Sequence, residues 1–335
     1  MNRSVLFTGR MMKKINILII GFFPQTTKNR IREVFPQEWS VCFASPEDYE
    51  EALCDTDIVI PEHVKINGAF LDQAPKLKLV QTGAGYDNVD LEACTKRGIV
   101  VCNASGINAG AVAEHVMALI LGWYKNIPYL DSFMKAHRDE RELDYTGGEL
   151  DGKTVGLIGT GAIGQRVATR CSAFGMKVLG YNRRNISFPG IEAVSFEELL
   201  HRSDIISVHV PLTQETLGMI STAEFERMKT TALLINTSRG AVLDEIALTE
   251  ALKDGKIAGA CLDVYTEEPL AKDSPLRDMK NVILTPHTAG LPDGVKFHIN
   301  RYRFFRSNFE KLISGQLPEH ALNATALITK EQDRD

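Results

Sequence analysis

The sequence predicts a two-domain α/β protein built on parallel sheets. Its 335 residues are too many for one typical hydrophobic core. Two separate series of short apolar runs alternate with helix-like segments, as parallel sheets covered by helices require. The second series opens with the pattern Gly159-x-Gly161-x-x-Gly164 between a strand-like run and a helix-like run. These observations predict a dinucleotide-binding domain together with a second, smaller domain.

The first third of the chain contains the first series. Four apolar runs predict strands, and they cover residues 15–20, 57–60, 77–80 and 99–102. Helix-like segments lie around residues 46–54, 66–73 and 90–97. Each run ends close to a glycine, a proline or an asparagine, which is typical of the turns that follow buried strands.

The second series follows a long apolar helix predicted over residues 111–124 and a polar, irregular segment at 126–150. The six strands predicted for it cover residues 155–158, 177–181, 205–210, 232–236, 259–264 and 282–284. A helix predicted over 295–314 closes the chain. The simplest organisation is a discontinuous substrate domain, 12–110 with 291–325, into which residues 111–290 are inserted as the nucleotide domain.

The three glycines of the second series have separate roles in a dinucleotide site. Gly159 allows a tight turn, Gly161 lets the backbone approach a pyrophosphate, and Gly164 lets the new helix pack on the strand. The helix then begins near Ala162 and Ile163. Its free N–H groups and the positive end of its dipole favour phosphate at that position.

Three polar residues follow three strands of the second series. Arg239 follows the strand at 232–236, Glu268 follows the strand at 259–264, and His287 follows the strand at 282–284. Carboxyl ends of parallel strands share one edge of a sheet, where ligands bind, so we expect these side chains to converge. An arginine grips a carboxylate with two hydrogen bonds, and an imidazole titrates near neutral pH. We therefore expect His287 to transfer a proton, Glu268 to support it and Arg239 to anchor the substrate.

Composition excludes several classes of function. The net charge of −5 argues against a nucleic-acid partner, and no apolar run is long enough to span a membrane. No His, Cys or Asp cluster has the spacing of metal ligands, so we expect no metal. The six cysteines form no Cys-x-x-Cys pair, which favours a reducing, cytoplasmic location. His115 and His209 lie within predicted elements and are interpreted as structural.

Several motifs, in order along the chain, resemble those of the D-isomer-specific 2-hydroxyacid dehydrogenase family. They are Gly83-Ala-Gly-Tyr-Asp-Asn-Val-Asp90, Asn108-Ala-Gly-Ala-Val-Ala-Glu-His115, the glycine pattern, Pro211-Leu-Thr-Gln-Glu-Thr216, Asn236-Thr-Ser-Arg-Gly240, Leu262-Asp-Val264 with Glu268-Pro-Leu, and Thr285-Pro-His287. The resemblance extends from about residue 15 to 313. It implies a Rossmann domain inserted in a flavodoxin-like substrate domain, with the active site in the cleft between them. It also implies a small 2-oxo or 2-hydroxy acid substrate and a homodimer formed through the nucleotide domain.

The resemblance also implies roles for individual residues. Arg239, Glu268 and His287 form the catalytic set, and the backbone N–H groups of Ala84 and Gly85 hold the substrate carboxylate with Asn108 nearby. The resemblance further implies that a third set of residues contacts the cofactor, namely Pro211, Thr216, Thr237, Ser238, Asp263 and Gly290. Arg239 and His287 are implied to contact the cofactor as well.

One position departs from the NAD-dependent pattern. An acidic residue is expected about 20 residues past the glycines to bind the adenine ribose, but Asn182 stands there, followed by Arg183 and Arg184. A carboxylate repels a 2′-phosphate, whereas guanidinium groups attract it. The sequence therefore favours NADP over NAD. The competing interpretation is that both arginines point into solvent and Asn182 binds the ribose hydroxyls of NAD.

Two other functions remain open on the sequence. One is a dehydrogenase of the same superfamily with another substrate, such as phosphite or formate; formate dehydrogenases resemble this chain but carry Gln where Glu268 stands. The other is a nucleotide-sensing corepressor or scaffold on the same fold. Glu268 therefore argues against formate. An intact catalytic set does not exclude the scaffold, and turnover of a panel of 2-oxo acids separates the scaffold from an enzyme.

Overall fold

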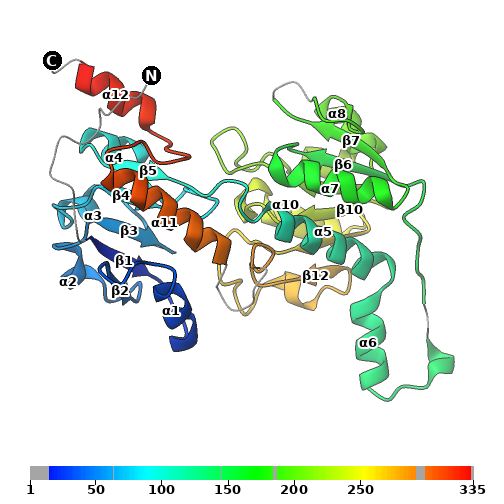
Figure 1. The fold of residues 1–335 in the computed structure, drawn as a ribbon. Coiled ribbons are helices and arrows are strands. Elements are labelled where there is room, and N and C mark those ends of the chain that lie inside the picture. Colours follow the sequence, from blue (N-terminus) through cyan, green and yellow to red (C-terminus); the bar gives the residue numbers. More distant parts are fainter. Residues whose placement is uncertain (1–14, 63, 144, 184–186, 292–298, 333–335) are drawn as a thin grey trace. The chain divides into compact units, whose positions relative to one another are not determined.

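The computed structural model describes residues 15–62, 64–143, 145–183, 187–291 and 299–332. The chain divides into two compact units (Figure 1). Unit 1 combines Met1–Asn108 with Leu291–Asp335, and unit 2 is Ala109–Gly290. Among the described residues, no helix combines the length and the apolar character needed to cross a membrane.

Unit 1 contains a five-stranded parallel sheet. Its strands are β1 (Asn16–Ile20), β2 (Ser40–Ala44), β3 (Ile58–Pro61), β4 (Leu79–Gln81) and β5 (Val100–Cys102). They are arranged in the order β2-β1-β3-β4-β5. This order is the flavodoxin-like one, in which the strand order reverses between β1 and β3.

Helices cover both faces of this sheet. They are α1 (Gln25–Arg32), α2 (Glu50–Leu53), α3 (Gly68–Asp72), α4 (Leu91–Lys96), α11 (Ile299–Ile313) and α12 (Ala324–Gln332). Alternation along β1 places Ile17 and Ile19 against Phe305 and Phe309 of α11, whereas Leu18 faces the core beneath α2, α3 and α4. Figure 1 shows α11 lying across the sheet. The last part of the chain therefore completes the core of its first part.

Three elements of unit 1 were not predicted. The sequence does not predict α1, because this helix is mostly polar and buries only Thr27 and Ile31. β2 lies at the sheet edge, where none of its five residues is fully buried, so its apolar signal is weak. α12 begins at residue 324, after the helix that was predicted to close the chain and next to the predicted end of the substrate domain at residue 325. The predicted start of the closing helix, 295–298, lies outside the described residues.

Unit 2 contains a seven-stranded parallel sheet. Its strands are β6 (Thr154–Ile158), β7 (Lys177–Tyr181), β8 (Glu192–Ala193), β9 (Ile205–Val208), β10 (Leu233–Asn236), β11 (Gly259–Leu262) and β12 (Val282–Leu284). Their order is β12-β11-β10-β9-β6-β7-β8. This is the Rossmann order, extended by β12 at one edge. β8 was not predicted, because its two residues are exposed.

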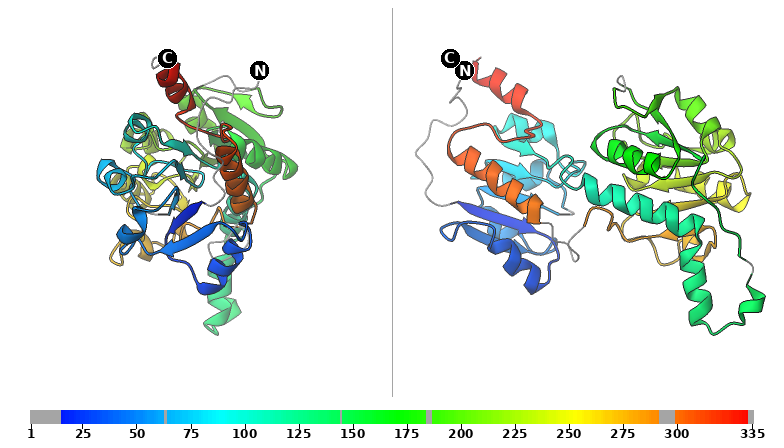
Figure 2. Two further views of the ribbon diagram at one scale, coloured as in Figure 1. Left: turned by 60° about the vertical axis from the view of Figure 1, so that its left-hand side comes forward. Right: turned by 45° about the vertical axis from the view of Figure 1, so that its right-hand side comes forward.

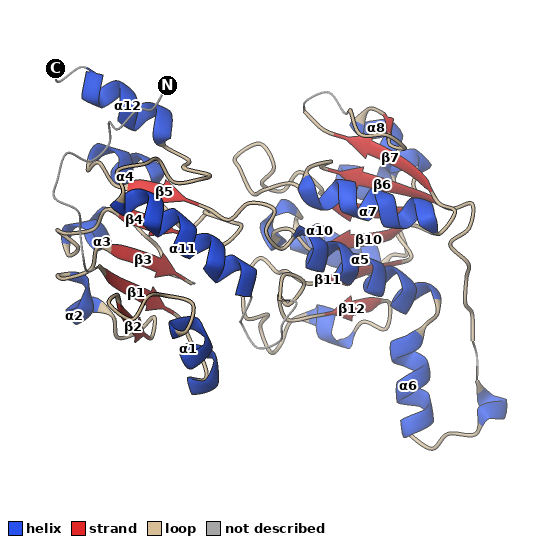
Figure 3. Ribbon diagram, viewed as in Figure 1, coloured by secondary structure: helices blue, strands red, loops and turns tan. Residues whose placement is uncertain are grey.

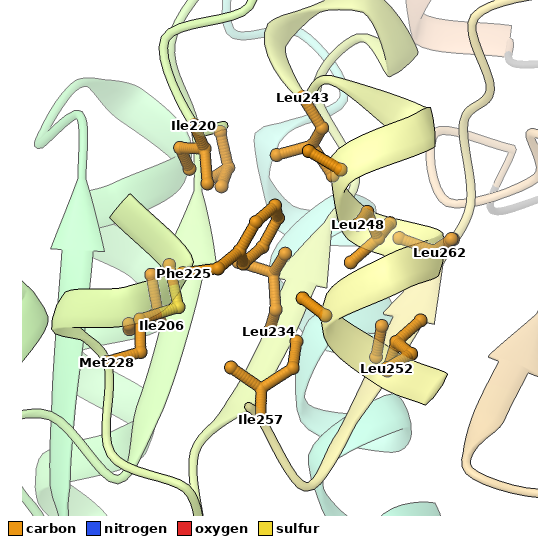
Figure 4. Close-up of a cluster of buried hydrophobic side chains, with 14 of the residues drawn as sticks. Ile206, Ile220, Phe225, Met228, Leu234, Leu243, Leu248, Leu252, Ile257 and Leu262 are labelled. Atoms are coloured by element: carbon orange, nitrogen blue, oxygen red, sulfur yellow. The ribbon is translucent and has the colours of Figure 1, made fainter. Parts of the chain in front are cut away.

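Helices and 3₁₀ turns complete unit 2. They are α5 (Ala109–Tyr124), α6 (Ile127–Lys135), η1 (Glu140–Glu142), α7 (Ala162–Ala173), α8 (Phe196–Arg202), α9 (Thr222–Arg227), η2 (Gly240–Val242), α10 (Glu245–Lys253) and η3 (Pro275–Asp278). α5 packs against α7 on one face of the sheet, and α8, α9 and α10 cover the other (Figure 3). Figure 4 shows the second face, where Phe225 and Leu248 pack around Leu234 of β10.

The segment 126–150 differs from the irregular excursion that the sequence predicts. It contains α6 and η1, and α6 extends away from the unit 2 sheet (Figure 2). Phe133 is the buried side chain of α6, whereas Ile127 and Met134 are exposed. The excursion is thus partly helical, and α6 carries exposed apolar side chains.

Candidate active site

Three neighbouring strands bring the predicted catalytic residues to one edge of unit 2. β10, β11 and β12 are parallel and adjacent, so the loops that follow them leave from the same edge of the sheet. Arg239 lies in the first of these loops, Glu268 in the second, and His287 in the third. The structure therefore gathers the three residues on loops that lie side by side.

His287 and Glu268 form a direct hydrogen bond. His287 Nδ1 donates to Glu268 Oε2 over 2.6 Å, and the Tyr265 amide donates to Glu268 Oε1 over 3.1 Å. The two side chains are 45% and 31% exposed, so the pair is reachable from solvent. With Nδ1 engaged, Nε2 is the ring nitrogen left to meet a ligand.

Several groups act on the ionisation of Glu268. Partial burial favours the neutral acid, but the hydrogen bond and positive charge of His287, the Tyr265 amide and the charge of Arg239 act in the opposite direction. Their combined effect holds the pKa of Glu268 below its ordinary value. Glu268 is therefore a carboxylate at neutral pH, and the positive charge of Arg239 contributes to the lowered pKa of Glu268.

The buried carboxylate of Asp263 fixes the loop that carries His287. Asp263 Oδ1 accepts from Thr285 Oγ1 at 2.6 Å and from the Thr288 amide at 2.9 Å, and Oδ2 accepts from the Ala289 amide at 2.9 Å. The His287 amide donates to the Asp263 carbonyl over 2.8 Å. His287 itself has a φ of 53°, so the loop holds its backbone in the left-handed region. Asp263, which the resemblance predicts to contact the cofactor, is thus a structural support of the loop that carries His287.

His115 reaches this loop from α5. Its Nε2 lies 3.1 Å from Thr285 Oγ1 and 3.7 Å from Asp263 Oδ1. Because Thr285 donates to Asp263, its hydroxyl oxygen accepts from His115. The sequence analysis interpreted His115 as structural, and in the structure it contacts the loop that carries His287. Thr285 and Tyr265 were missed. Tyr265 donates its hydroxyl hydrogen bond to the Thr285 carbonyl over 2.9 Å.

Asn236 builds the turn that presents Arg239. Asn236 Oδ1 accepts from the Ser238 amide at 3.0 Å and from Ser238 Oγ at 2.9 Å, while Nδ2 donates to the Arg239 carbonyl over 2.9 Å. Asn236 stands in the motif that predicted the site, but its own role was missed. A methyl group on Gly240 would lie 1.8 Å from the carbonyl carbon of Tyr265, so glycine allows the first two loops to touch.

Unit 1 carries the predicted carboxylate-binding residues. Its loop after β4 is fixed through two carbonyls, since Gly83 O accepts from the Ala104 amide at 2.8 Å and Ala84 O accepts from Asn103 Nδ2 at 3.0 Å. Within the part of the chain that the structure describes, the amides of Ala84 and Gly85 donate no hydrogen bond. They are therefore available to an anion.

Asn108, the last residue of the first segment of unit 1, also has an unused polar atom. Its buried Oδ1 has no hydrogen-bond partner among the described residues. A buried acceptor without a partner is costly, and a ligand that donates a hydrogen bond would satisfy it.

The glycine turn after β6 has the backbone that a dinucleotide site needs. Gly159 has a φ of 97°, and a methyl group on it would lie 2.7 Å from the His209 carbonyl oxygen. A methyl group on Gly164 would lie 2.3 Å from the Gly159 carbonyl oxygen, so glycine lets α7 approach β6. A methyl group on Gly161 would meet no atom within 4 Å. The face of this turn beside Gly161 is thus open, next to the N-terminal residues of α7, Ala162 and Ile163.

The predicted adenosine side of the site lies after β7. Asn182 is exposed, and Arg183 Nη1 lies 3.8 Å from Glu215 Oε2 in an exposed pair. Arg184 lies outside the described residues. Thr216 shapes the neighbouring loop, because its hydroxyl donates to the Pro211 carbonyl over 2.6 Å.

Other predicted cofactor contacts lie around the catalytic loops. Thr237 is nearly buried, and its Oγ1 has no hydrogen-bond partner among the residues described. Gly290 follows Ala289 at the end of the loop that carries His287.

His209 is buried, which lowers its pKa to about 4, and its Nε2 lies 3.0 Å from Ser207 Oγ. His209 is therefore neutral and structural. Across the described ranges, no group of three His, Cys, Asp or Glu residues is placed to hold a metal ion.

Comparison with known proteins identifies the family. The family model of the D-isomer specific 2-hydroxyacid dehydrogenase, NAD binding domain, matches residues 117–289. The chain belongs to the D-isomer specific 2-hydroxyacid dehydrogenase family. This dehydrogenase is an oxidoreductase whose matched region is the Rossmann sheet of unit 2. The resemblance predicted from the sequence motifs is confirmed, as is the fold class.

Two relatives and one solved structure show the extent of the similarity. The dehydrogenase is 41% identical to the glyoxylate reductase of Thermococcus litoralis over 276 residues, which cover 79% of this chain and 82% of that enzyme. It is 44% identical to the D-3-phosphoglycerate dehydrogenase of Archaeoglobus fulgidus over 237 residues, which cover 69% of this chain. The match spans only 45% of the length of that relative. The structure of an acyclic imino acid reductase in complex with NADPH and D-Arg superposes with a TM-score of 0.80 at 33% identity, covering 92% of this chain and 99% of that one.

Proposed function

We propose that the protein interconverts a small 2-oxo acid and a D-2-hydroxy acid by hydride transfer with NADP or NAD. The 2.6 Å hydrogen bond between His287 and Glu268, on loops beside the Arg239 loop, carries this proposal. In this assignment unit 1 is the substrate domain, predicted as 12–110 with 291–325, and unit 2 is the nucleotide domain, predicted as 111–290.

His287 is the proposed proton donor. In the reductive direction, hydride adds to carbon 2 of the 2-oxo acid, and the carbonyl oxygen takes a proton from His287 Nε2. The ionised Glu268 stabilises the protonated ring through Nδ1 and fixes its orientation. In the oxidative direction the neutral ring accepts the proton from the hydroxyl group. The same pair therefore serves both directions.

Each unit has groups that are proposed to bind a carboxylate. The Arg239 guanidinium pairs with the substrate carboxylate, which fixes the orientation of carbon 2 and polarises the carbonyl group. In unit 1, the unused amides of Ala84 and Gly85 are the proposed donors to a substrate carboxylate, and Asn108 Oδ1 is the proposed acceptor of a hydrogen bond from a ligand.

Unit 2 has the features that a nicotinamide dinucleotide requires. The space beside Gly161 and the N-terminus of α7 fit a pyrophosphate, and the unpartnered Thr237 Oγ1 fits a polar group of the nicotinamide half. Ser238, Asp263 and the remaining loop residues would line the same half. When bound, the reduced nicotinamide supplies the hydride.

We propose NADP as the preferred cofactor. Asn182 lacks the charge that repels a 2′-phosphate, and Arg183 lies beside it, with Arg184 outside the described residues. The pair between Arg183 and Glu215 is exposed, so it is weak and a phosphate can displace Glu215. The NADPH-bound relative is compatible with this preference, and the description of the family model by NAD is the reason for testing both cofactors.

The proposed assembly is a homodimer formed through unit 2, in the cytoplasm. The exposed apolar residues of α6 favour a partner subunit, and all six cysteines are free thiols.

Turnover of a panel of 2-oxo acids with NADH and NADPH tests the proposed reaction. Glyoxylate, pyruvate, hydroxypyruvate and a branched 2-oxo acid form the panel, with formate and phosphite as oxidisable alternatives. The proposal expects reduction of at least one 2-oxo acid to the D-hydroxy acid. Oxidation of formate or phosphite alone would identify the alternative dehydrogenase, and cofactor binding without any turnover would identify a nucleotide-sensing scaffold.

A further inference from the structure

A charged pair lies at the carboxyl edge of the unit 1 sheet. Glu62 comes directly after β3, and Arg301 lies in the first turn of α11. Arg301 Nη2 donates to Glu62 Oε1 over 2.7 Å and to the Tyr302 hydroxyl over 3.3 Å. The pair thus joins residues 239 positions apart in the sequence.

The surroundings place this pair where open α/β sheets bind ligands. A methyl group on Gly21, which follows β1, would lie 3.1 Å from Glu62 Cβ. A methyl group on Gly83, which follows β4, would lie 3.6 Å from Arg301 Nη1. The pair therefore lies over the ends of β1, β3 and β4, where the strand order reverses between β1 and β3. It also lies beside the loop that carries Ala84 and Gly85.

The pair is partly buried and stays charged. The side chains of Arg301 and Glu62 are 14% and 24% exposed. Burial acts against the guanidinium charge, but Glu62 and Tyr302 outweigh it and raise the pKa of Arg301. An ion pair this far from water is weak support for stability, since an apolar pair of similar volume often serves equally well. A role in recognition accounts for its place at this edge.

We propose that Glu62 and Arg301 read the side chain of the substrate and select a 2-oxo acid whose third carbon carries a hydroxyl group. This inference rests on the proposed function, in which the amides of Ala84 and Gly85 hold the carboxylate of the same molecule. A hydroxyl group can donate to Glu62 and accept from Arg301 at once.

Charge and solvation at the Glu62–Arg301 pair disfavour substrates with other groups on carbon 3. A methyl group would cover polar atoms of the pair without a hydrogen bond in return. A phosphate group would lie against the Glu62 carboxylate, and this repulsion offsets its attraction to Arg301. The pair thus distinguishes three substrates that differ only at carbon 3, namely pyruvate, hydroxypyruvate and 3-phosphohydroxypyruvate.

The test measures kcat/KM for these three acids with the full-length enzyme. We expect hydroxypyruvate to exceed each of the others by at least about tenfold, because a site that hydrogen-bonds a hydroxyl group rejects analogues lacking it. Arg301→Met should reduce the ratio of hydroxypyruvate to pyruvate at least about fivefold. Glu62→Gln should raise kcat/KM for 3-phosphohydroxypyruvate at least about fivefold, because it removes the repulsion and keeps the arginine.

The matched controls are Arg306→Met and Glu310→Gln, which disrupt an exposed ion pair of 2.8 Å on the same helix. They should leave all three ratios unchanged. A folding defect cannot raise kcat/KM, so the increase expected for Glu62→Gln with 3-phosphohydroxypyruvate tests the inference even if Arg301→Met fails to fold. A wild-type preference for pyruvate or the phosphate ester overturns the inference. So does a Glu62→Gln enzyme with unchanged ratios. Absence of turnover with every 2-oxo acid and both cofactors overturns the proposed function instead.

Discussion

His287 has one ring nitrogen engaged and one available. Nδ1 donates to Glu268, so Nε2 is the atom that can exchange a proton with substrate. We predict that His287→Ala lowers kcat by about 10²–10⁴-fold, the usual worth of general acid–base catalysis. Cofactor affinity should change little, because the proposed dinucleotide contacts lie mainly elsewhere in unit 2. Steady-state kinetics and NADPH fluorescence titration measure the two effects. An unchanged kcat would remove His287 from the mechanism.

The second prediction at the residue scale concerns Asn182 and the two arginines that follow it, which bear on the choice between NADPH and NADH. We expect a lower KM for NADPH than for NADH, since a guanidinium–phosphate pair is worth about 1.5–3 kcal/mol, or roughly ten- to a hundredfold in affinity. Arg183→Ala combined with Arg184→Ala should abolish this preference, and Asn182→Asp should reverse it. Glu215→Gln should strengthen the preference, because Arg183 then loses its competing carboxylate. Equal kcat/KM for both cofactors in the wild type and the double variant would favour ribose binding by Asn182 alone.

The convergence of the three proposed catalytic residues could be predicted because each follows a strand that is strongly apolar. Strand order and parallel direction then bring their loops together without further information. The supporting residues could not be found in this way. His115 acts on Thr285 from 170 positions away, and the sequence does not give the packing of α5 that brings it there. Asn236 acts locally, but its amide looks the same in the sequence as an ordinary turn residue.

At the scale of elements, Asp204 joins β9 to β6 and to Lys229, which precedes β10, at the edge opposite the candidate site. It lies just before β9, and its carboxylate accepts from the Thr154 amide of β6 at 2.9 Å and from Lys229 Nζ at 2.8 Å. Burial acts to raise the pKa of Asp204, but Lys229 and the Thr154 amide outweigh it and lower the pKa below the ordinary 3.8. Asp204 therefore stabilises the fold as a carboxylate.

We predict that Asp204→Asn lowers the free energy of unfolding by about 1 kcal/mol near pH 7. The melting temperature should fall by about 2–4 °C. A lowered carboxyl pKa contributes stability above the unfolded-state pKa, and that contribution is lost as pH falls through the folded-state pKa. The difference in stability between wild type and variant should therefore be largest at pH 6–7 and vanish well below pH 4. Thermal melts across this range measure it, and a difference that persists in strong acid contradicts the assignment.

The elements that the sequence predicted and those that it missed differ in burial. β6 and β10 are buried along most of their length and were predicted within a residue or two. β2, β8 and α1 lie at edges or expose most of their residues, so hydrophobic periodicity carries little information about them.

At the scale of the whole molecule, the exposed apolar residues of α6 bear on assembly. We predict a homodimer, because Ile127 and Met134 are each more than half exposed on a helix that extends from unit 2. Light scattering at micromolar concentration should give twice the mass of one 37.1 kDa chain. Ile127→Asp with Met134→Asp should shift the protein toward monomer, whereas the same change at exposed Leu217 should not. A wild-type mass of one chain would rule out the dimer at that concentration.

The placement of α11 has a consequence for the order in which the chain folds during synthesis. Unit 2 is one continuous segment, so all the residues of its core emerge from the ribosome in a single stretch. The sheet of unit 1 is synthesised first, but Tyr302, Phe305 and Phe309, which cover its face, are synthesised after unit 2 is complete. We therefore expect the second-made unit to reach its native state first. The nascent sheet would leave its isoleucines exposed until α11 is synthesised, and chaperones that bind apolar strands would have their longest opportunity there.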